Sequence, residues 1–341
     1  MVVVRVVVTG GAGFIGSHLV RRLAGRGSEV TVLDNLSRQG ARETAAALAA
    51  LRGVHVEPVD VRSADGIATE VRAARPDVVV HLAAQTAVTG SLANPATDFE
   101  VNAAGTLHLL EALRQFAGDA LVLFASTNKV YGDLSGIGAH IDGSRYVVPD
   151  RPDGIGEEEP FAPETPYGCS KATADLYVHE YSARFGIRGV VFRQSCIYGP
   201  YDHAVEDQGW VVWLASRVCR RQPVNIFGDG FQVRDLLWID DLLDLYDRVI
   251  DRPTPAVGQA FNIGGGADFS QSVWGELAPL LSDLLGRPVD APTYLPWRAG
   301  DQRWYASDIR KAMATWDWRP TCSPRQGLEV LVTRAAEVLS R

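Results

Sequence analysis

A run of β-branched residues that ends in a glycine-rich turn constrains the fold of this chain most strongly. Residues 2–9 are mostly valine and end at Thr9, and the turn that follows reads Gly10-Gly11-Ala12-Gly13-Phe14-Ile15-Gly16. Apolar residues at helical spacing begin directly after the turn. Glycines at 10, 13 and 16 allow a tight turn, close approach of a pyrophosphate to the backbone, and close packing of helix on strand. The pattern predicts a strand, a dinucleotide-binding turn and a helix.

An acidic side chain ends the next predicted strand. Residues 29–33 form this strand, and Asp34 follows it, 24 positions after Gly10. A carboxylate there can accept hydrogen bonds from both hydroxyls of an adenosine ribose, and its charge repels a 2′-phosphate. The spacing favours NAD over NADP, although the nearby Arg38 leaves NADP open.

Further predicted strands alternate with helices along the first 200 residues. Strands are predicted over 55–58, 77–81, 120–125 and 188–194, with helices over 98–116 and 172–185. This alternation implies right-handed crossovers and one parallel sheet, a Rossmann-type doubly wound α/β fold with a smaller C-terminal substrate-binding lobe. We expect an NAD-binding domain over 1–197, with an insertion over 133–165 near the sugar site. The lobe is expected over 198–341, with segments that cross back.

Several side chains follow these strands at the edge where ligands bind in such sheets. Asp60, followed by Val61, can meet the adenine amino group. The small residues Leu82-Ala83-Ala84, followed by Gln85, suit a path along the cofactor. Thr127 ends the strand over 120–125 and is placed where chemistry would occur.

Tyr167 and Lys171 lie four residues apart on a predicted helix and therefore share one face. An ammonium beside a phenol favours the phenolate and lowers the pKa of the tyrosine. With the Thr127 hydroxyl nearby to orient a substrate, the pair can take a proton from a sugar alcohol while a hydride leaves the carbon. The sequence therefore predicts an alcohol-oxidising site.

Composition excludes several classes of function. The chain is 46% hydrophobic and 22% charged with a net charge of −8, which is ordinary for a globular protein and too acidic for a nucleic-acid binder. The N-terminal apolar run is too short for a signal peptide or a membrane span. Four cysteines without paired spacing and seven histidines without ligand spacing predict no disulfide and no metal site. A cytoplasmic location is expected.

The motifs resemble the extended short-chain dehydrogenase/reductases that act on nucleotide-linked sugars. The glycine turn, Asp34, Asp60, Asn102 and the Thr127, Tyr167 and Lys171 triad carry this resemblance. Within the family the chain is most similar to the CDP-tyvelose (CDP-paratose) 2-epimerases. The segments that carry this similarity are Asp34–Arg38, Ser126–Asp133, Thr165–Lys171, Asp207–Val211, Gln232–Asp235, Phe261–Gly265 and Asp301–Arg303.

The resemblance implies NAD-dependent inversion at C2 of a CDP-linked hexose by transient oxidation to a 2-keto sugar. It also implies a homodimer or homotetramer. The expected cofactor contacts are Gly10, Gly13, Phe14, Ile15, Gly16, Asp34, Asn35, Ser37, Arg38, Asp60, Val61, Leu82, Ala83, Ala84, Gln85, Asn102, Tyr167 and Lys171. The expected substrate contacts are Gln85, Thr127, Asn128, Gln194, Cys196, Gln208, Arg234 and Arg303, with both arginines on the diphosphate. The chain departs from the subgroup at Gln194 to Cys196 and at Phe231, where sugar or nucleotide would be touched.

Three alternatives stay open at this point. A 4,6-dehydratase needs an acidic pair after Thr127, and this chain has Asn128-Lys129 instead. A 4-epimerase, or a 2-epimerase of another nucleotide sugar, depends on pocket shape, which the sequence determines poorly. A non-catalytic NAD-binding regulator would be expected to lack Tyr167 or Lys171, and both are present.

Overall fold

The protein was analysed as a computed structural model that describes residues 3–200, 203–206 and 208–339. The chain divides into two compact units made of interleaved segments. The first unit comprises Met1–Thr127, Pro166–Arg193 and Leu243–Phe261, and the second comprises Asn128–Thr165, Gln194–Leu242 and Asn262–Arg341. We expected the first domain to be the continuous stretch 1–197, with the insertion over 133–165 inside it. The structure instead assigns that insertion to the second unit and residues 243–261 to the first.

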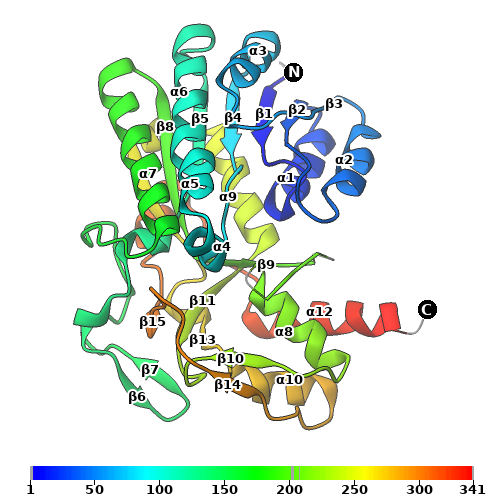
Figure 1. The fold of residues 1–341 in the computed structure, drawn as a ribbon, viewed down its shortest axis with the longest axis vertical. Helices are drawn as coiled ribbons and strands as arrows, with labels where there is room; N and C mark the ends of the chain where they lie inside the picture. The colour runs from blue at the N-terminus through cyan, green and yellow to red at the C-terminus, as the bar shows by residue number, and fades with distance from the viewer. Residues whose placement is uncertain (1–2, 201–202, 207, 340–341) are drawn as a thin grey trace. The chain divides into compact units, whose positions relative to one another are not determined.

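A seven-stranded sheet organises the first unit, in the order β12-β8-β5-β4-β1-β2-β3 (Figure 1). β1 pairs in parallel with β2 and with β4, and β4 pairs in parallel with β5. This order is a doubly wound Rossmann-type sheet, as the sequence predicted. Its strands are β1 (Arg5–Thr9), β2 (Glu29–Leu33), β3 (Val54–Glu57), β4 (Val78–His81), β5 (Leu121–Thr127), β8 (Arg188–Gln194) and β12 (Gln259–Ile263).

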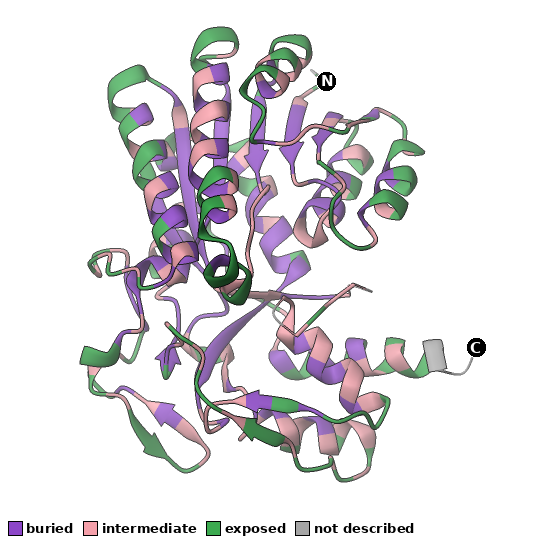
Figure 2. Cartoon of the chain, in the orientation of Figure 1, coloured by how far each residue is buried: buried purple, intermediate pink, exposed green. Residues whose placement is uncertain are grey.

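The valine run forms β1 because a strand covered on both faces needs apolar side chains on both. Val6, Val7 and Val8 are at most 2% exposed, and so are Val79 and Val80 of β4. Helices cover both faces of this sheet, with their purple inner sides against it and green outer sides in Figure 2. The helices are α1 (Phe14–Gly25), α2 (Ala41–Ala49), α3 (Ala64–Ala74), α4 (Val88–Ala93), α5 (Pro95–Phe99), α6 (Gly105–Phe116), α7 (Pro166–Phe185) and α9 (Ile239–Asp251).

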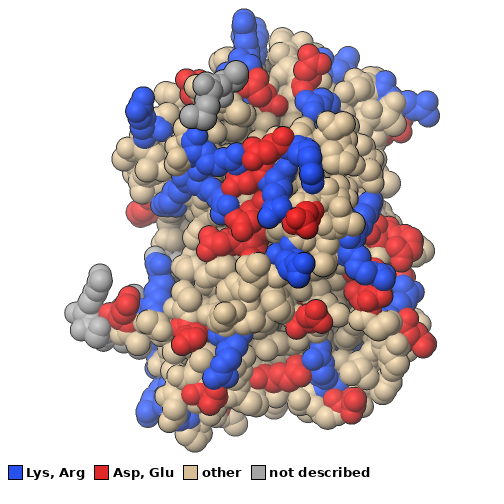
Figure 3. Space-filling view, turned by 180° about the vertical axis from the view of Figure 1, so that it is seen from behind, with Lys and Arg blue, Asp and Glu red and all other residues tan. Residues whose placement is uncertain are grey.

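Charged side chains join α1 to α9. Arg22 pairs with Asp247 at 2.5 Å and also with Asp244, and Arg26 pairs with Asp251 at 2.6 Å. Figure 3 shows acidic and basic side chains crowded together on the rear face of the molecule. These pairs are partly exposed, so each contributes up to about 1 kcal/mol, and they mainly fix the position of α9.

The sequence predicted one helix over 98–116, and the structure corrects this. The segment consists of the end of α5, a π-helical turn over Glu100–Ala104, and α6. A π-turn inserts an extra residue per turn and is common at functional sites. It contains Asn102, which is 1% exposed, so the irregular turn carries a side chain that the sequence had placed in the cofactor site.

In its described residues, the second unit contains three small sheets. β11 (Val233–Trp238) pairs with β13 (Ser270–Ser272), β15 (Trp304–Tyr305) and β9 (Cys196–Tyr198). β10 (Asn225–Phe227) pairs with β14 (Thr293–Leu295), and the insertion forms the hairpin β6 (His140–Asp142) and β7 (Arg145–Val147). Its helices are α8 (Trp210–Cys219), α10 (Leu277–Leu285), α11 (Arg310–Trp316) and α12 (Pro324–Leu339).

Among the described residues, no helix combines the length with the apolar character that a bilayer crossing requires. The cytoplasmic location stays a prediction.

The glycine turn generates the first testable prediction. A Cβ at Gly16 would overlap the carbonyl oxygen of Gly10 and lie 2.6 Å from the Cα of Gly11. Gly16→Ala therefore forces the turn away from α1, and overpacking of this kind costs about 1–3 kcal/mol. We expect a lower midpoint of thermal unfolding and weaker NAD binding, measured by differential scanning calorimetry and isothermal titration.

Gly25→Ala is the matched control, because it lies at the other end of α1 and a Cβ there has no atom within 4 Å. It should leave NAD affinity unchanged. Equal NAD affinity of Gly16→Ala and the wild-type protein would contradict a dinucleotide-binding role for the turn.

Candidate active site

The glycine turn leaves room for a dinucleotide at the start of α1. Gly10 has φ of +69°, and a Cβ on it would lie 2.7 Å from the backbone nitrogen of Ala83. In the described part of the chain, no side chain caps the helix that begins at Phe14, so its first N–H groups and its positive dipole end can bind an anion. The residues therefore fit the pyrophosphate of NAD.

Asp34 closes the turn from the end of β2. Its Oδ2 accepts a hydrogen bond from the Ala12 backbone at 3.0 Å, and its Oδ1 accepts one from the Leu36 backbone at 2.9 Å. Ser37 Oγ donates to Asn35 Oδ1 at 2.7 Å. Arg38 donates to the carbonyl of Ala84 at 3.1 Å. The predicted ribose segment thus contacts both the glycine turn and the segment after β4.

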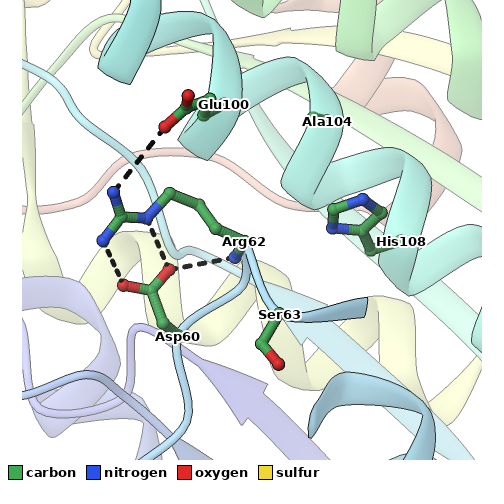
Figure 4. A pocket seen from close by; sticks show the side chains of 6 residues that line it. All are labelled: Asp60, Arg62, Ser63, Glu100, Ala104 and His108. Atoms are coloured by element: carbon green, nitrogen blue, oxygen red, sulfur yellow. Dashed lines mark hydrogen bonds and ion pairs between the residues drawn. The ribbon is translucent and has the colours of Figure 1, made fainter. Parts of the chain in front are cut away.

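Asp60 lies beside an open hollow of about 560 Å³ in the first unit (Figure 4). Its carboxylate accepts hydrogen bonds from Arg62 Nε at 3.0 Å and Arg62 Nη2 at 2.8 Å, and from Asn35 Nδ2 at 2.9 Å. Hydrogen bonding from Arg62 holds the pKa of Asp60 well below its usual range. Glu100 and His108 line the far side of the hollow. Asp60 therefore stays ionised and fixed in orientation, as a role toward an adenine amino group requires.

A buried amide joins the segment after β4 to α7, the helix that carries Tyr167 and Lys171. Asn102 Oδ1 accepts from the Gln85 backbone at 2.9 Å, and its Nδ2 donates to the Gln85 carbonyl at 2.9 Å and to Ser170 Oγ at 3.0 Å. Asn102 therefore holds Gln85 in place against α7. These contacts give Asn102 and Gln85 a structural role that does not depend on a bound ligand.

Thr127, Tyr167 and Lys171 come together in the first unit, each less than 10% exposed. Thr127 ends β5, as predicted, and its side chain is hydrogen-bonded to the phenol of Tyr167. Burial raises the pKa of Tyr167, and the Thr127 hydroxyl opposes this shift. Burial also lowers the pKa of Lys171 to about 7, against the charges of Asp175 and Asp98.

The Lys171 ammonium points toward the end of β5 in this structure. It donates to the carbonyl of Ala125 and lies 4.3 Å from the centroid of the Phe124 ring. Asp175, one turn further along α7, is fully buried, accepts from Ser126 Oγ at 2.7 Å, and is paired with Arg193 at 3.1 Å. The sequence reasoning missed Asp175 and Arg193. The (i, i+4) spacing of Lys171 and Asp175 was the available signal.

In the second unit, Arg234 of β11 shares a carboxylate with a lysine. Arg234 Nη2 and Lys129 Nζ approach the same oxygen of Asp301, at 2.5 Å and 3.3 Å. Lys129 also donates to the carbonyl of Gly300 at 3.0 Å, and its burial lowers its pKa. Burial raises the pKa of Asp301, but the charges of Arg234 and Lys129 outweigh it and lower the value to about 2. One carboxylate is therefore shared by two cationic side chains in this cluster.

The other predicted substrate residues of this unit contact residues other than Asp301. Asn128 Nδ2 donates to Gln302 Oε1 at 3.1 Å, and Trp210 Nε1 donates to Cys196 Sγ at 3.4 Å. The exposed Arg303 lies 5.7 Å from the ring centroid of Tyr146 and 5.8 Å from that of Trp297. Gln194 is buried and Gln208 half-buried, whereas Asp207 of the motif lies outside the described residues.

Within the ranges 3–200, 203–206 and 208–339, no three His, Cys, Asp or Glu side chains are grouped as a metal site would require. The absence of a metal stays a prediction. Two acidic residues that the sequence reasoning did not weigh, Asp98 and Asp301, contact predicted site residues; their contacts depend on the fold and leave no local signal.

Comparison with known proteins assigns the chain to a family. Residues 6–264 match the NAD dependent epimerase/dehydratase family. The chain is 38% identical to the CDP-paratose 2-epimerase of Salmonella typhi, over 95% of this chain and 97% of that protein. It is 32% identical to the dTDP-glucose 4,6-dehydratase of Mycolicibacterium smegmatis, over 93% and 88%.

The crystal structure of the Thermus thermophilus UDP-glucose 4-epimerase complexed with NAD superposes with a TM-score of 0.80, at 33% identity, covering 97% of this chain and 99% of that one. These matches confirm the predicted resemblance, the Rossmann-type fold and NAD as the cofactor. The chain belongs to the NAD dependent epimerase/dehydratase family.

Proposed function

We propose that this protein inverts C2 of a CDP-linked hexose of the CDP-paratose/CDP-tyvelose type. The triad of Thr127, Tyr167 and Lys171 supports oxidation of a sugar alcohol. The relative with 38% identity is named as a CDP-paratose 2-epimerase, which supports C2 over C4. Epimerisation at C4 is the second candidate, because a UDP-glucose 4-epimerase is 33% identical and has the same fold.

The observation that carries the proposal against dehydration lies directly after Thr127. An eliminating enzyme needs a carboxylic acid there to protonate the departing hydroxyl. The chain has Asn128 and Lys129, and both are engaged within the second unit, with Gln302 and with Asp301. Neither the Asn128 amide nor the Lys129 ammonium can act as the carboxylic acid that elimination needs. Reversible oxidation is therefore the chemistry that we propose for the first unit.

The residues of the triad divide the proton transfer among them. Bound NAD supplies the oxidising and reducing equivalent for the alcohol–ketone interconversion. Tyr167, as phenolate, takes the proton of the C2 hydroxyl, and Thr127 orients that hydroxyl through its own. Burial raises the pKa of Tyr167, and the Thr127 hydroxyl and the charge of Arg38 favour the phenolate against it. We propose that Lys171 assists from the same face of the helix.

Inversion then requires the 2-keto sugar to turn its opposite face toward the nicotinamide while its nucleotide stays bound. Arg234 and Arg303 are the proposed diphosphate ligands, because guanidinium groups bind phosphate oxygens in pairs. The same Tyr167 returns the proton to the oxygen. Net oxidation is zero, so one NAD serves repeated turnovers.

The product of turnover tests this function. Purified protein incubated with CDP-, UDP-, GDP- and dTDP-hexoses should change only a CDP-hexose, with NMR ring couplings that show inversion at C2. A C2-deuterated substrate should keep its label, because direct oxidation at C2 moves the deuterium to the cofactor and back. Inversion at C4 would contradict the C2 assignment, and loss of label to solvent would contradict direct oxidation.

Substitution of the phenol tests the role of Tyr167. Tyr167→Phe removes the proton acceptor and should lower kcat by about 10²–10⁴-fold, the usual contribution of general acid–base catalysis. The affinity for NAD should change little, since the ring is kept. Tyr294→Phe on β14 is the control, because Tyr294 is 54% exposed and belongs neither to the triad nor to α6 or α7, and its kcat should stay at the wild-type value. Equal kcat values for both variants would rule out the triad mechanism.

We also propose that α6 and α7 pair with a second copy of this chain. Their outer faces expose large apolar side chains, with Leu176 57%, Tyr177 44% and Phe185 53% exposed on α7 and Phe116 39% exposed on α6. Apolar patches of this kind usually mark an interface. Two neighbouring helices that both expose apolar side chains suit the two-fold symmetric contact that homodimers favour.

Light scattering after size-exclusion chromatography tests the pairing. The wild-type protein should be a dimer or larger, and Leu176→Arg should shift it toward monomer, because an unpaired charge would be buried in the contact. Val330→Arg, on α12 and 46% exposed, should keep the wild-type mass. A monomeric wild-type protein would contradict the proposal.

A further inference from the structure

A carboxylate that the proposed mechanism does not use lies buried against the catalytic helix. Asp98 belongs to α5, and its residue is 0% exposed. Burial raises its pKa, as expected for an acid without contact to water. No ion pair to Asp98 is formed by the part of the chain that the structure describes. Burial of a carboxylate without a paired cation lowers the stability of the folded state, so the presence of Asp98 needs a functional explanation.

Three side-chain donors satisfy the Asp98 carboxylate. Ser170 Oγ donates to Oδ2 at 2.5 Å, and Asn102 Nδ2 and Gln85 Nε2 each donate to Oδ1 at 3.3 Å. All three donors are neutral, so the negative charge is solvated by hydrogen bonds and is not cancelled. The Lys171 ammonium is the charged group that acts on Asp98, and it lowers the pKa of this carboxyl less than burial raises it.

The nearest of those donors belongs to the catalytic segment. Ser170 lies between Tyr167 and Lys171 in the first turns of α7, and its Oγ is also 3.1 Å from the Tyr167 carbonyl. The carboxylate of Asp98 raises the pKa of Tyr167 and that of Lys171, in each case less than burial alters it. Asp98 thus opposes loss of a proton from both members of the pair.

Other charged or titratable groups face the same site from every packed element. They are Asp175 of α7, His81 of β4, Arg193 of β8 and Arg38 after β2. His81 is buried, and burial lowers its pKa to about 3, so it is neutral throughout the working range. Asp175 is paired with Arg193 and raises the pKa of Lys171 more than Asp98 does, whereas Asp98 is the carboxylate that raises the pKa of Tyr167.

We propose that Asp98 is a positioning residue that fixes Ser170 and the first turn of α7, and that its buried charge raises the pH at which the Tyr167–Lys171 pair gives up its proton. This inference rests on the proposed function of the triad. It makes the acidic limb of the pH–rate profile a property of Asp98 as well as of Tyr167.

Asp98→Asn separates charge from hydrogen bonding. The amide oxygen can accept from Asn102 and Gln85 as the carboxylate does. The amide nitrogen can donate to Ser170 Oγ, whose own hydroxyl proton can turn to the Tyr167 carbonyl at 3.1 Å. The network stays complete while the charge is lost. The expected result is a displacement of the Tyr167 titration midpoint to lower pH by about one unit, the size that one nearby charge commonly produces.

The titration is measured without a sugar substrate. In NAD-saturated protein labelled at the tyrosine ζ carbon, NMR follows each phenol through pH, and Tyr167→Phe identifies the signal among the ten tyrosines. In a second readout, the acidic limb of kcat should move to lower pH with the NMR midpoint. The NMR result stands even if the substrate is another nucleotide sugar, so its failure is distinguishable from failure of the C2 assignment.

Matched variants keep the test decisive. Asp98→Ser removes the charge with a smaller side chain and should move the midpoint in the same direction. Asp98→Glu keeps the charge and should leave it near the wild-type value. Asp77→Asn removes an exposed carboxylate that pairs with Arg5 and should not move it. A midpoint that stays at the wild-type pH in folded Asp98→Asn or Asp98→Ser would overturn the proposal, even if stability or NAD affinity changes.

Discussion

Burial of the Lys171 ammonium constrains the arrangement of the first unit. A charge that is removed from water must be compensated by acceptors and opposite charges at fixed positions. The carbonyl of Ala125, the Phe124 ring and the carboxylate of Asp175 lie around it. Asp175 in turn needs Ser126 and Arg193. The end of β5, the first turns of α7 and β8 are therefore tied to one cation, and Thr127 and Tyr167 take their places from those elements.

The parts of this arrangement that follow from local pattern could be predicted from the sequence. The valine run before Gly10 requires a strand covered on both faces, and the glycines that follow admit only a tight turn into a helix. Asp34 and Thr127 come directly after strands, so their position at one edge of the sheet follows from parallel topology. Tyr167 and Lys171 share a face because of helical spacing alone.

The parts that depend on contacts distant in sequence could not be predicted. Asp98 is 72 positions from Ser170, and Asp301 is 172 positions from Lys129. Each pair joins ordinary residue types whose spacing has no meaning before folding. The π-turn at Glu100–Ala104 was not predicted for another reason: its apolar residues also fit the spacing of an α-helix. The interleaving of 243–261 with the first unit also depends on distant contacts, because β12 joins the sheet beside β8 and α9 buries Leu245, Tyr246 and Val249.

The contact of Lys129 with Asp301 bears on which substrate fits the proposed function, because Lys129 lies two residues after Thr127. Lys129 and Arg234 share a single carboxylate oxygen, so their cluster keeps one positive charge in excess while both cations are mostly buried. Buried excess charge is unfavourable unless an anion joins it. In the proposed function a diphosphate supplies that anion, whereas a neutral sugar does not. Since Lys129 is two residues from Thr127, a cationic position that favours a nucleotide-linked substrate also removes the acid that elimination would need at this turn.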